Sequence, residues 1–306
     1  MLLRKRIPLK YVGALVWKEM IAAMIIAGTI SYYDEYFEDW GLIFPIVDMT
    51  IPSLLGTMIT LILAFRMNQS YERWWEARKV WGGIVNDTRA LIREVSFLST
   101  REKKGSEAQS QFSKDMIAMA MMWPNELVKE LRGLGGKGEA LRMSERLKAD
   151  LRNLNVHAPA GLLHIMQSRI HDAYQNEVLN DYQQVQLTDT LNRLGDHMGK
   201  AERIKKTVFP HLYSILIDAI IWFFVFLLPL AYRDPNKYFE FPVSMMICTV
   251  FIVLEKLAER LQDPFDGHPT DIPIQDIANS LDRYGAGILG ETVPLNNSNE
   301  DTFFVM

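Results

Sequence analysis

The sequence has one cysteine, no excess of basic residues and almost none of the alternation of apolar and polar residues that marks strands. Cys248 stands alone within an apolar segment, so no disulfide framework can form within one chain. Lys and Arg total 33 against 37 Asp and Glu, a formal net charge of -4, which lacks the basic footprint of a nucleic-acid-binding domain. The charge balance therefore predicts no nucleic acid among the partners. The apolar residues recur at spacings of three and four, which predicts an all-α protein.

Catalytic and metal-binding patterns are also missing. The glycine-rich stretch around Lys137 has no Ser or Thr after the lysine and no strand before it, so it does not match a phosphate-binding loop. His157, His164 and His171 recur every seven residues, about 10 Å apart on a helix, which is too far for three ligands of one ion. We therefore expect these histidines on a solvated face, and we predict no metal, no cofactor and no enzymatic activity.

What the sequence does have is four long apolar blocks, each able to supply most of a membrane span of about 20 residues. They cover residues 11–33, 40–65, 212–232 and 241–254, the last with a helix that continues towards Leu261. The predicted domains are 1–66 (N-terminal segment and two spans), 67–208 (cytosolic helical domain), 209–258 (two spans) and 259–306 (helical extension and tail). From Gly285 onwards weak periodicity predicts an extended or disordered tail.

Charges flanking these blocks predict their orientation. Basic clusters lie before the first block, after the second, before the third and after the fourth, whereas the loop between the first two blocks is acidic and has no base. Lys and Arg close to span ends stay on the cytoplasmic side. We therefore predict four spans with both termini in the cytoplasm.

The second block leads into the segment 51–78, whose helical surface is divided. One stripe consists of small, hydroxyl and larger residues: Ser53, Gly56, Thr57, Thr60, Leu61, Ala64, Phe65 and Asn68. Such a stripe allows close packing of helices in lipid, and it could also line water. Two carboxylates lie within the apolar blocks: Asp48 suits a pore mouth or the membrane interface, and for Asp218 we expect hydrogen bonds between helices.

Polar motifs follow the second and fourth blocks. The Trp- and Arg-rich segment 73–83 is too polar for a simple interfacial belt, so we interpret it as a junction packed beneath the spans. Asp263, Asp266 and Asp271 surround a Pro-rich turn after the fourth block. Carboxylates in such a turn could hold Ca2+ or could serve turn and capping geometry.

Three of these segments, in order and in register with the spans, resemble the bestrophin family and in particular its short bacterial members. They are F-R-x-N-x-S-Y-x-R-W-W-E-A-R at 65–78, G-x-x-E-R-I-x-x-T at 199–207, and D-P-F-x-x-x-x-x-D-x-P at 263–273. The motif residues are Arg66, Asn68, Ser70, Tyr71, Arg73, Trp74, Trp75, Glu76, Arg78, Asp263, Pro264 and Phe265. The resemblance covers nearly the whole chain.

The resemblance implies a homopentamer in the lipid bilayer, with one axial pore and a vestibule enclosed by the cytosolic helices. Five copies of the second span would form a hydrophobic neck, whose three positions correspond here to Thr57, Leu61 and Phe65. Because Thr57 is polar, the upper ring should be wetter than in a typical relative. A second constriction at the cytosolic exit corresponds to Tyr182. A bacterial inner membrane is the implied location.

The resemblance also bears on ions. Animal members sense Ca2+ through an acidic run that here contains His268 and Pro269, with Asp266 in place of a glycine, so we predict no Ca2+ gating. Animal and plant members conduct anions, whereas bacterial relatives can favour cations. Asp48 is a further acid of the predicted outer mouth. The outer loop itself carries four acids: Asp34, Glu35, Glu38 and Asp39. Repeated five times they supply about twenty carboxylates, which favours monovalent cations such as Na+. A chloride channel and a non-conducting membrane scaffold remain the alternatives.

Overall fold

A computed structural model describes residues 9–37, 47–98, 107–134, 145–154, 156–207, 210–231 and 237–291. These residues form helices and short connections with no strand among them, which confirms the all-α prediction. The helices are α1 (Leu9–Phe37), α2 (Thr50–Leu98), α3 (Glu107–Leu131), α4 (Glu145–Leu154), α5 (Ala158–Gln175), α6 (Asp181–Lys206), α7 (His211–Ala231), α8 (Lys237–Gln262) and α9 (Ile274–Leu289).

The helices divide into two compact units. The membrane unit consists of the described residues within 9–74 and 210–263, so it holds α1, the first part of α2, α7 and α8. Four segments are long and apolar enough to cross a bilayer: Lys10–Tyr32, Thr50–Leu98, His211–Ala231 and Phe241–Gln262. These segments agree with the four predicted spans, including the continuation of the fourth beyond Leu254.

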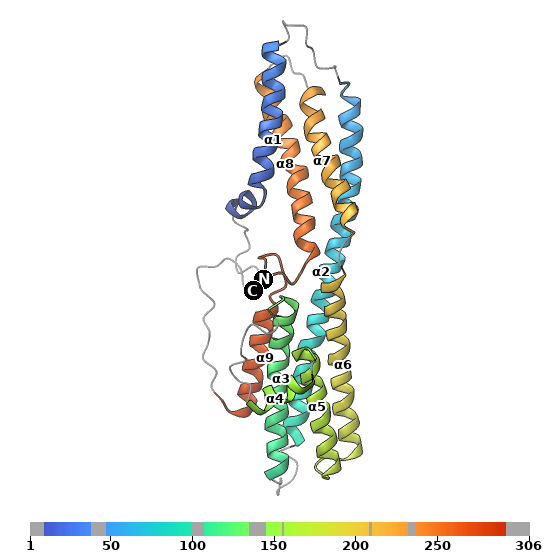
Figure 1. Cartoon of the computed structure of the whole chain (residues 1–306), viewed down its shortest axis with the longest axis vertical. Helices are drawn as coiled ribbons and strands as arrows, with labels where there is room; N and C mark the ends of the chain where they lie inside the picture. Colours follow the sequence, from blue (N-terminus) through green and yellow to red (C-terminus); the bar gives the residue numbers. More distant parts are fainter. Residues whose placement is uncertain are drawn as a thin grey trace. The chain divides into compact units, whose positions relative to one another are not determined.

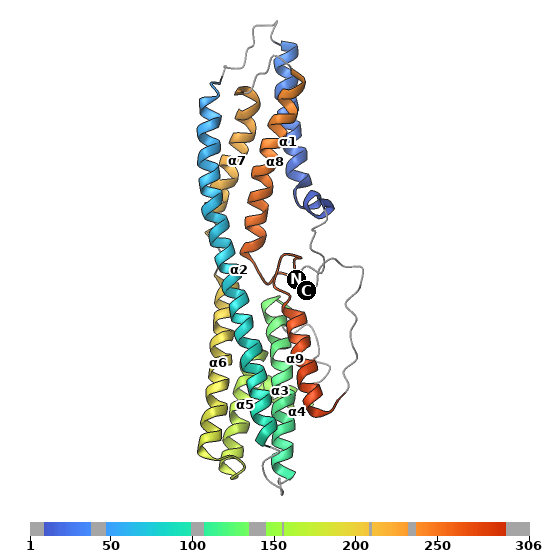
Figure 2. The ribbon, with the colours of Figure 1, turned by 180° about the vertical axis from the view of Figure 1, so that it is seen from behind.

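The core of the membrane unit is formed by apolar residues from all four of its helices. Figures 1 and 2 show α1, α7 and α8 running side by side. Ile59 and Leu63 of α2 are buried in the same cluster as Ile217 and Phe224 of α7 and Ile252 of α8. This packing determines which side of α2 faces inwards.

Helix α2 differs from its prediction at its start and in its length. It begins at Thr50, with Pro52 in its first turn, where proline costs no hydrogen bond. Residues 38–46, the early part of the predicted second block, lie outside the described residues. The helix then continues without interruption through the Trp- and Arg-rich segment to Leu98. Its residues up to Trp74 belong to the membrane unit and those from Trp75 onwards belong to the second unit.

The second unit consists of the described residues within 75–207 and 264–291. Here α3 packs against α5 and α9, and α5 packs against α4 and α6. Trp123 is fully buried, and its indole N–H donates to the carbonyl oxygen of Pro159 at 3.0 Å. The periodicity of the sequence between the second and third blocks predicts helices, and the described residues there form them; the unit begins later than the predicted domain 67–208 and also includes residues after Asp263.

The tail prediction was wrong for residues 285–289, which complete α9. Gly285 lies against Met121 of α3, so closely that a β-carbon would overlap the methionine side chain. The helix ends at Gly290, which adopts the left-handed conformation typical of a helix C-terminus. The small residues that weakened the sequence pattern are those that allow α9 to approach α3. Residues 292–306 lie outside the described part of the chain.

Candidate functional site

The three predicted neck residues lie along one exposed side of α2. Thr57 is exposed, Leu61 is 58% exposed and Phe65 is 60% exposed on the single chain. The other side of the helix carries Ile59 and Leu63, which are buried in the core. Residues four apart share a helix face, so Thr57, Leu61 and Phe65 form a continuous row directed away from their own chain.

Hydroxyl groups on this side of α2 are turned towards their own helix. Ser53, Thr57 and Thr60 each donate to the carbonyl oxygen four residues earlier, at 2.7, 2.9 and 2.8 Å. Because the hydroxyl hydrogens are used in this way, the oxygen lone pairs remain available as acceptors. Gly56 does not belong to the exposed row, because it lies against the ring of Phe224 in α7.

Asp48 lies just before α2 and serves as its cap. Its carboxylate accepts a hydrogen bond from the backbone N–H of Thr50 at 2.7 Å. Hydrogen bonds from the hydroxyl and the backbone of Thr50 lower the pKa of Asp48, so this exposed carboxylate is ionised at neutral pH. A capping role and a fixed negative charge at the start of α2 therefore coexist.

The remaining predicted carboxylates are the four acids of the outer mouth and Asp218 in α7. Asp34 and Glu35 fall in the last turns of α1, where the side chains are not described, and Glu38 and Asp39 lie outside the described residues. Asp218 of α7 is exposed on the single chain, and it makes no hydrogen bond to another helix within the described part of the structure. The hydrogen bond between helices expected for Asp218 is therefore not made within the described part of a single chain, and it stays a prediction.

The polar residues of the first motif, 65–78, form hydrogen bonds and ion pairs with several partners. Asn68 donates to Glu72 one turn later at 3.0 Å, and Arg73 lies 3.7 Å from the carboxylate of Asp263. Glu76 accepts from Arg203 of α6 at 2.6 Å. The other residues of the motif range from buried to exposed: Arg66 and Ser70 are buried, Trp74 is half-buried, and Tyr71, Trp75 and Arg78 are exposed. The rings of Tyr71 and Trp74 stack with their centroids 6.2 Å apart.

The Asp-Pro-Phe turn is closed by its own backbone. Asp271 is buried, and one carboxylate oxygen accepts from the backbone N–H groups of Gly267 and His268 at 2.8 and 2.9 Å. Burial raises the pKa of Asp271 despite these hydrogen bonds. Asp266 forms an ion pair with Lys205 of α6, and Phe265 is buried. The three carboxylates of this turn thus serve ion pairs and turn geometry, as one of the two sequence interpretations expected.

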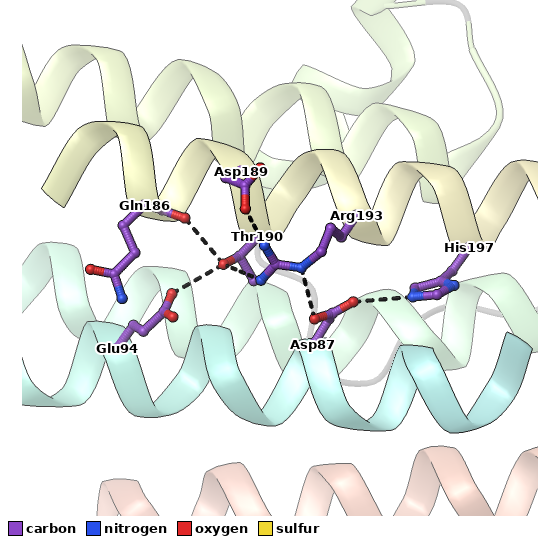
Figure 3. Close-up of polar contacts among 7 residues, drawn as sticks. All are labelled: Asp87, Glu94, Gln186, Asp189, Thr190, Arg193 and His197. Carbon is purple, nitrogen blue, oxygen red and sulfur yellow. Dashed lines mark hydrogen bonds and ion pairs between the residues drawn. The ribbon is translucent and has the colours of Figure 1, made fainter. Parts of the chain in front are cut away.

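A polar network between α2 and α6 was not predicted from the sequence (Figure 3). Asp87 of α2 accepts from Arg193 Nε at 3.0 Å and lies 3.1 Å from His197 Nε2. Arg193 also donates to Thr190 Oγ1 at 2.9 Å and pairs with Asp189. The hydrogen bond with Asp87 raises the pKa of Arg193. Because Asp87 lies 106 residues from Arg193 in the chain, no local pattern indicates this pairing.

Tyr182, the predicted cytosolic aperture, lies in the first turn of α6 and is 88% exposed. The turn is fixed by a capping box, in which the backbone N–H of Asn180 donates to Gln183 Oε1 and the backbone N–H of Gln183 donates to Asn180 Oδ1, both at 2.9 Å. Val185, one turn further along the helix, is also exposed. An aromatic side chain on a rigid start of a helix is thus presented away from the chain.

These features define a helical membrane protein with four candidate spans, a second helical unit and an exposed polar-to-apolar row on the longest span. Residues 10–284 match the family described as bacterial and fungal bestrophin proteins. The chain belongs to the bestrophin family, which is a family of ion channels and not of enzymes.

Individual relatives agree with this assignment. The chain is 30% identical over 241 residues to the voltage-dependent anion channel-forming protein alr2987 of Nostoc, covering 78% of this chain and 76% of that protein. It is 31% identical over 231 residues to the voltage-dependent anion channel-forming protein YneE of Escherichia coli K12, covering 75% and 73%. The crystal structure of a bestrophin homologue from Klebsiella pneumoniae superposes with a TM-score of 0.79 at 22% identity, over 91% of this chain and 100% of that one.

Proposed function

We propose that the chain assembles as a homopentamer in a bacterial inner membrane, with both termini in the cytoplasm, and conducts monovalent ions through one axial pore. The observation that carries this proposal is the row of Thr57, Leu61 and Phe65. These residues are exposed on a helix whose other side is buried in the membrane unit. A row of this kind in a member of a channel family needs either lipid or an assembly axis to cover it.

In this pentamer the rings of Leu61 and Phe65 form a hydrophobic constriction, and the ring of Thr57 lies above them. A narrow apolar constriction resists ions because water leaves it readily. The row runs along an uninterrupted helix, which supports rings stacked at regular intervals. Tyr182 forms a second ring at the cytosolic exit, in keeping with its exposure and its capped helix turn.

We propose a preference for cations such as Na+. Asp48 is ionised and exposed at the start of the neck helix, and five copies place a ring of negative charge there. The hydroxyl oxygens of Ser53 and Thr57 add acceptor lone pairs along the same side of the helix. Chloride is the second candidate, because the relatives from Nostoc and Escherichia coli are named as anion channel-forming proteins.

Two measurements test the proposal. Fivefold symmetry of detergent-purified particles is expected, and another symmetry would contradict the assembly. In planar bilayers under a NaCl gradient, the reversal potential should move towards the sodium equilibrium potential. A shift towards the chloride equilibrium potential would replace the cation proposal with the anion alternative, and the absence of any current would favour a scaffold.

The variant Asp48→Asn isolates the charge at the start of α2. An asparagine oxygen can still accept from the Thr50 N–H, so the cap is kept while the charge is removed. Cation preference should fall in Asp48→Asn relative to the wild type. Thr50→Ser is a matched control that keeps both the carboxylate and the hydroxyl, and it should leave the reversal potential unchanged.

A further inference from the structure

Arg66 is the residue next to Phe65, yet its side chain is only 2% exposed. Its Nη1 lies 3.1 Å from Oε1 of Glu255 in α8, and its Nη2 donates to the hydroxyl of Ser214 in α7 at 3.4 Å. The side chain of Glu255 is 7% exposed, so both charges of this pair are buried. The guanidinium group of α2 therefore links to two other helices inside the membrane unit.

The pair extends into a chain of charges that includes α1. Lys256 Nζ lies 3.7 Å from the second carboxylate oxygen of Glu255, 2.9 Å from Glu259 and 3.5 Å from Glu19 of α1. Ser214 of α7 accepts from Arg66, so all four helices of the membrane unit contribute to one polar cluster around Arg66.

Burial makes this connection hard to rearrange. Two charges removed from water have lost their hydration, and separating them leaves each uncompensated in an apolar surrounding. A rotation of α2 that carried Arg66 away from Glu255 would incur this cost. Successive residues on a helix point about 100° apart, so the direction of Arg66 determines the direction of Phe65.

We propose that the Arg66–Glu255 pair is a positioning device that fixes the rotation of α2 at the lower ring of the neck. Arg66 does not line the pore; it anchors to α8 the side of the helix that lies about 100° around from Phe65, and in this way it holds Phe65 towards the axis. The inference rests on the proposed channel function, because it assigns a role to Phe65 in the neck. It adds a residue set, Arg66, Ser214 and Glu255, that controls neck geometry from within the membrane unit.

A graded series of variants tests the device. Ser214→Ala removes one contact of the guanidinium group. Arg66→Lys keeps the charge but has a single amine, which cannot reproduce the planar guanidinium that contacts Glu255 and Ser214 through separate nitrogens. The double variant Arg66→Met with Glu255→Met replaces both charges by side chains of similar length, so no buried charge is left unpaired. Thr249→Val is the matched control, since Thr249 is a polar residue of α8 that contacts α1 and its own helix.

Single-channel recordings should show open probability changed by about threefold or more in the double variant and in Arg66→Lys, with a smaller change in Ser214→Ala. Thr249→Val should match the wild type. Should the double variant not assemble, Arg66→Lys and Ser214→Ala decide the question. Assembled variants with wild-type open probability and conductance would overturn the proposal.

A second measurement does not depend on currents. In a Cys248→Ala background, a cysteine introduced by Phe65→Cys is labelled with a membrane-impermeant thiol reagent, with and without the double variant. The labelling rate should change by about threefold when the pair is removed, because the direction of position 65 is released. An unchanged rate would overturn the positioning role, whereas a silent wild-type protein with a changed rate would contradict only the channel function.

Discussion

The imidazole ring of His197 on α6 lies against Gly83 on α2, so closely that a β-carbon at position 83 would overlap the ring. The ring cannot simply turn aside, because its Nε2 lies 3.1 Å from the carboxylate of Asp87 (Figure 3). The same carboxylate accepts from Arg193, so one close approach of two helices supports a network of charges. Glycine at position 83 is thus required for packing between α2 and α6.

The variant Gly83→Ala should destabilise the protein by about 1–3 kcal/mol, because the added methyl group overpacks a closely fitted contact. Gly82→Ala is the matched control, since the nearest atom to a β-carbon there is the end of Arg78 at 3.9 Å. Alanine at position 82 should be neutral or stabilising by up to about 1 kcal/mol, as alanine favours helix. Thermal unfolding of both purified variants gives the comparison, and equal melting temperatures would contradict the contact.

Thr57→Leu should make the upper ring of the proposed neck apolar and lower single-channel conductance by about three- to tenfold, because an apolar ring loses water more readily. Phe65→Ala should act in the opposite direction by widening the lower ring. Met58→Leu is the control, because Met58 lies about 100° around the helix from Thr57. Bilayer recordings of the three variants measure the effect. Identical currents in Thr57→Leu, Phe65→Ala and wild type would disprove the assignment of the neck.

Asp271 should make stability depend on pH in a defined direction. Burial raises the pKa of its carboxyl group in the folded protein above the ordinary value of an aspartic acid. A raised pKa contributes stability that is present below the unfolded value and is lost as pH rises through the folded value. Asp271→Asn, whose side-chain oxygen can still accept from Gly267 and His268, should therefore gain stability relative to wild type as pH increases from about 4 to 7, by about 1 kcal/mol. Melting temperatures of both proteins across this range test the trend, and parallel curves would refute it.

Calcium should not open the channel. The carboxylate of Asp266 is paired with Lys205, and one oxygen of Asp271 is held by two backbone N–H groups. A Ca2+ ion would have to replace these contacts before binding, at a cost in free energy that charged and buried groups make large. We expect currents of the reconstituted protein to be unchanged as free Ca2+ is raised through the micromolar range. A steep rise of current in this titration would show that the turn rearranges to bind the ion.

The neck and the polar residues around it show how much of the site local sequence patterns can predict. The spacing of four residues predicts that Thr57, Leu61 and Phe65 share one face of a helix, whereas their role in the neck is implied by the family resemblance and their exposure is given by the structure. The direction of Arg66 could not be predicted in this way. Its main partner, Glu255, lies 189 residues away, and an arginine beside a membrane span is more commonly turned towards the interface.

At the end of α9 and in the Asp-Pro-Phe turn, too, the local sequence left open what contacts with distant residues decide. Gly285 weakens a helix pattern when the sequence is considered alone, yet its lack of a side chain is what allows contact with Met121. The acids of the turn left Ca2+ binding and turn chemistry equally open, because both uses need carboxylates at short spacing. The partners of Asp263 and Asp266, Arg73 and Lys205, come from other helices and are brought to the turn only by folding.

The sequence by itself determined that the protein has four apolar helices, a large helical unit and the motifs of the bestrophin family. These properties depend on hydrophobicity and on residue spacing along one helix, which are local. Only the tertiary structure decided which side of α2 is buried, that Arg66 is anchored to Glu255 and Ser214, and that Asp87 joins α2 to α6. The physical reason is that a buried charge needs a partner, and that partner is supplied by residues distant in the chain.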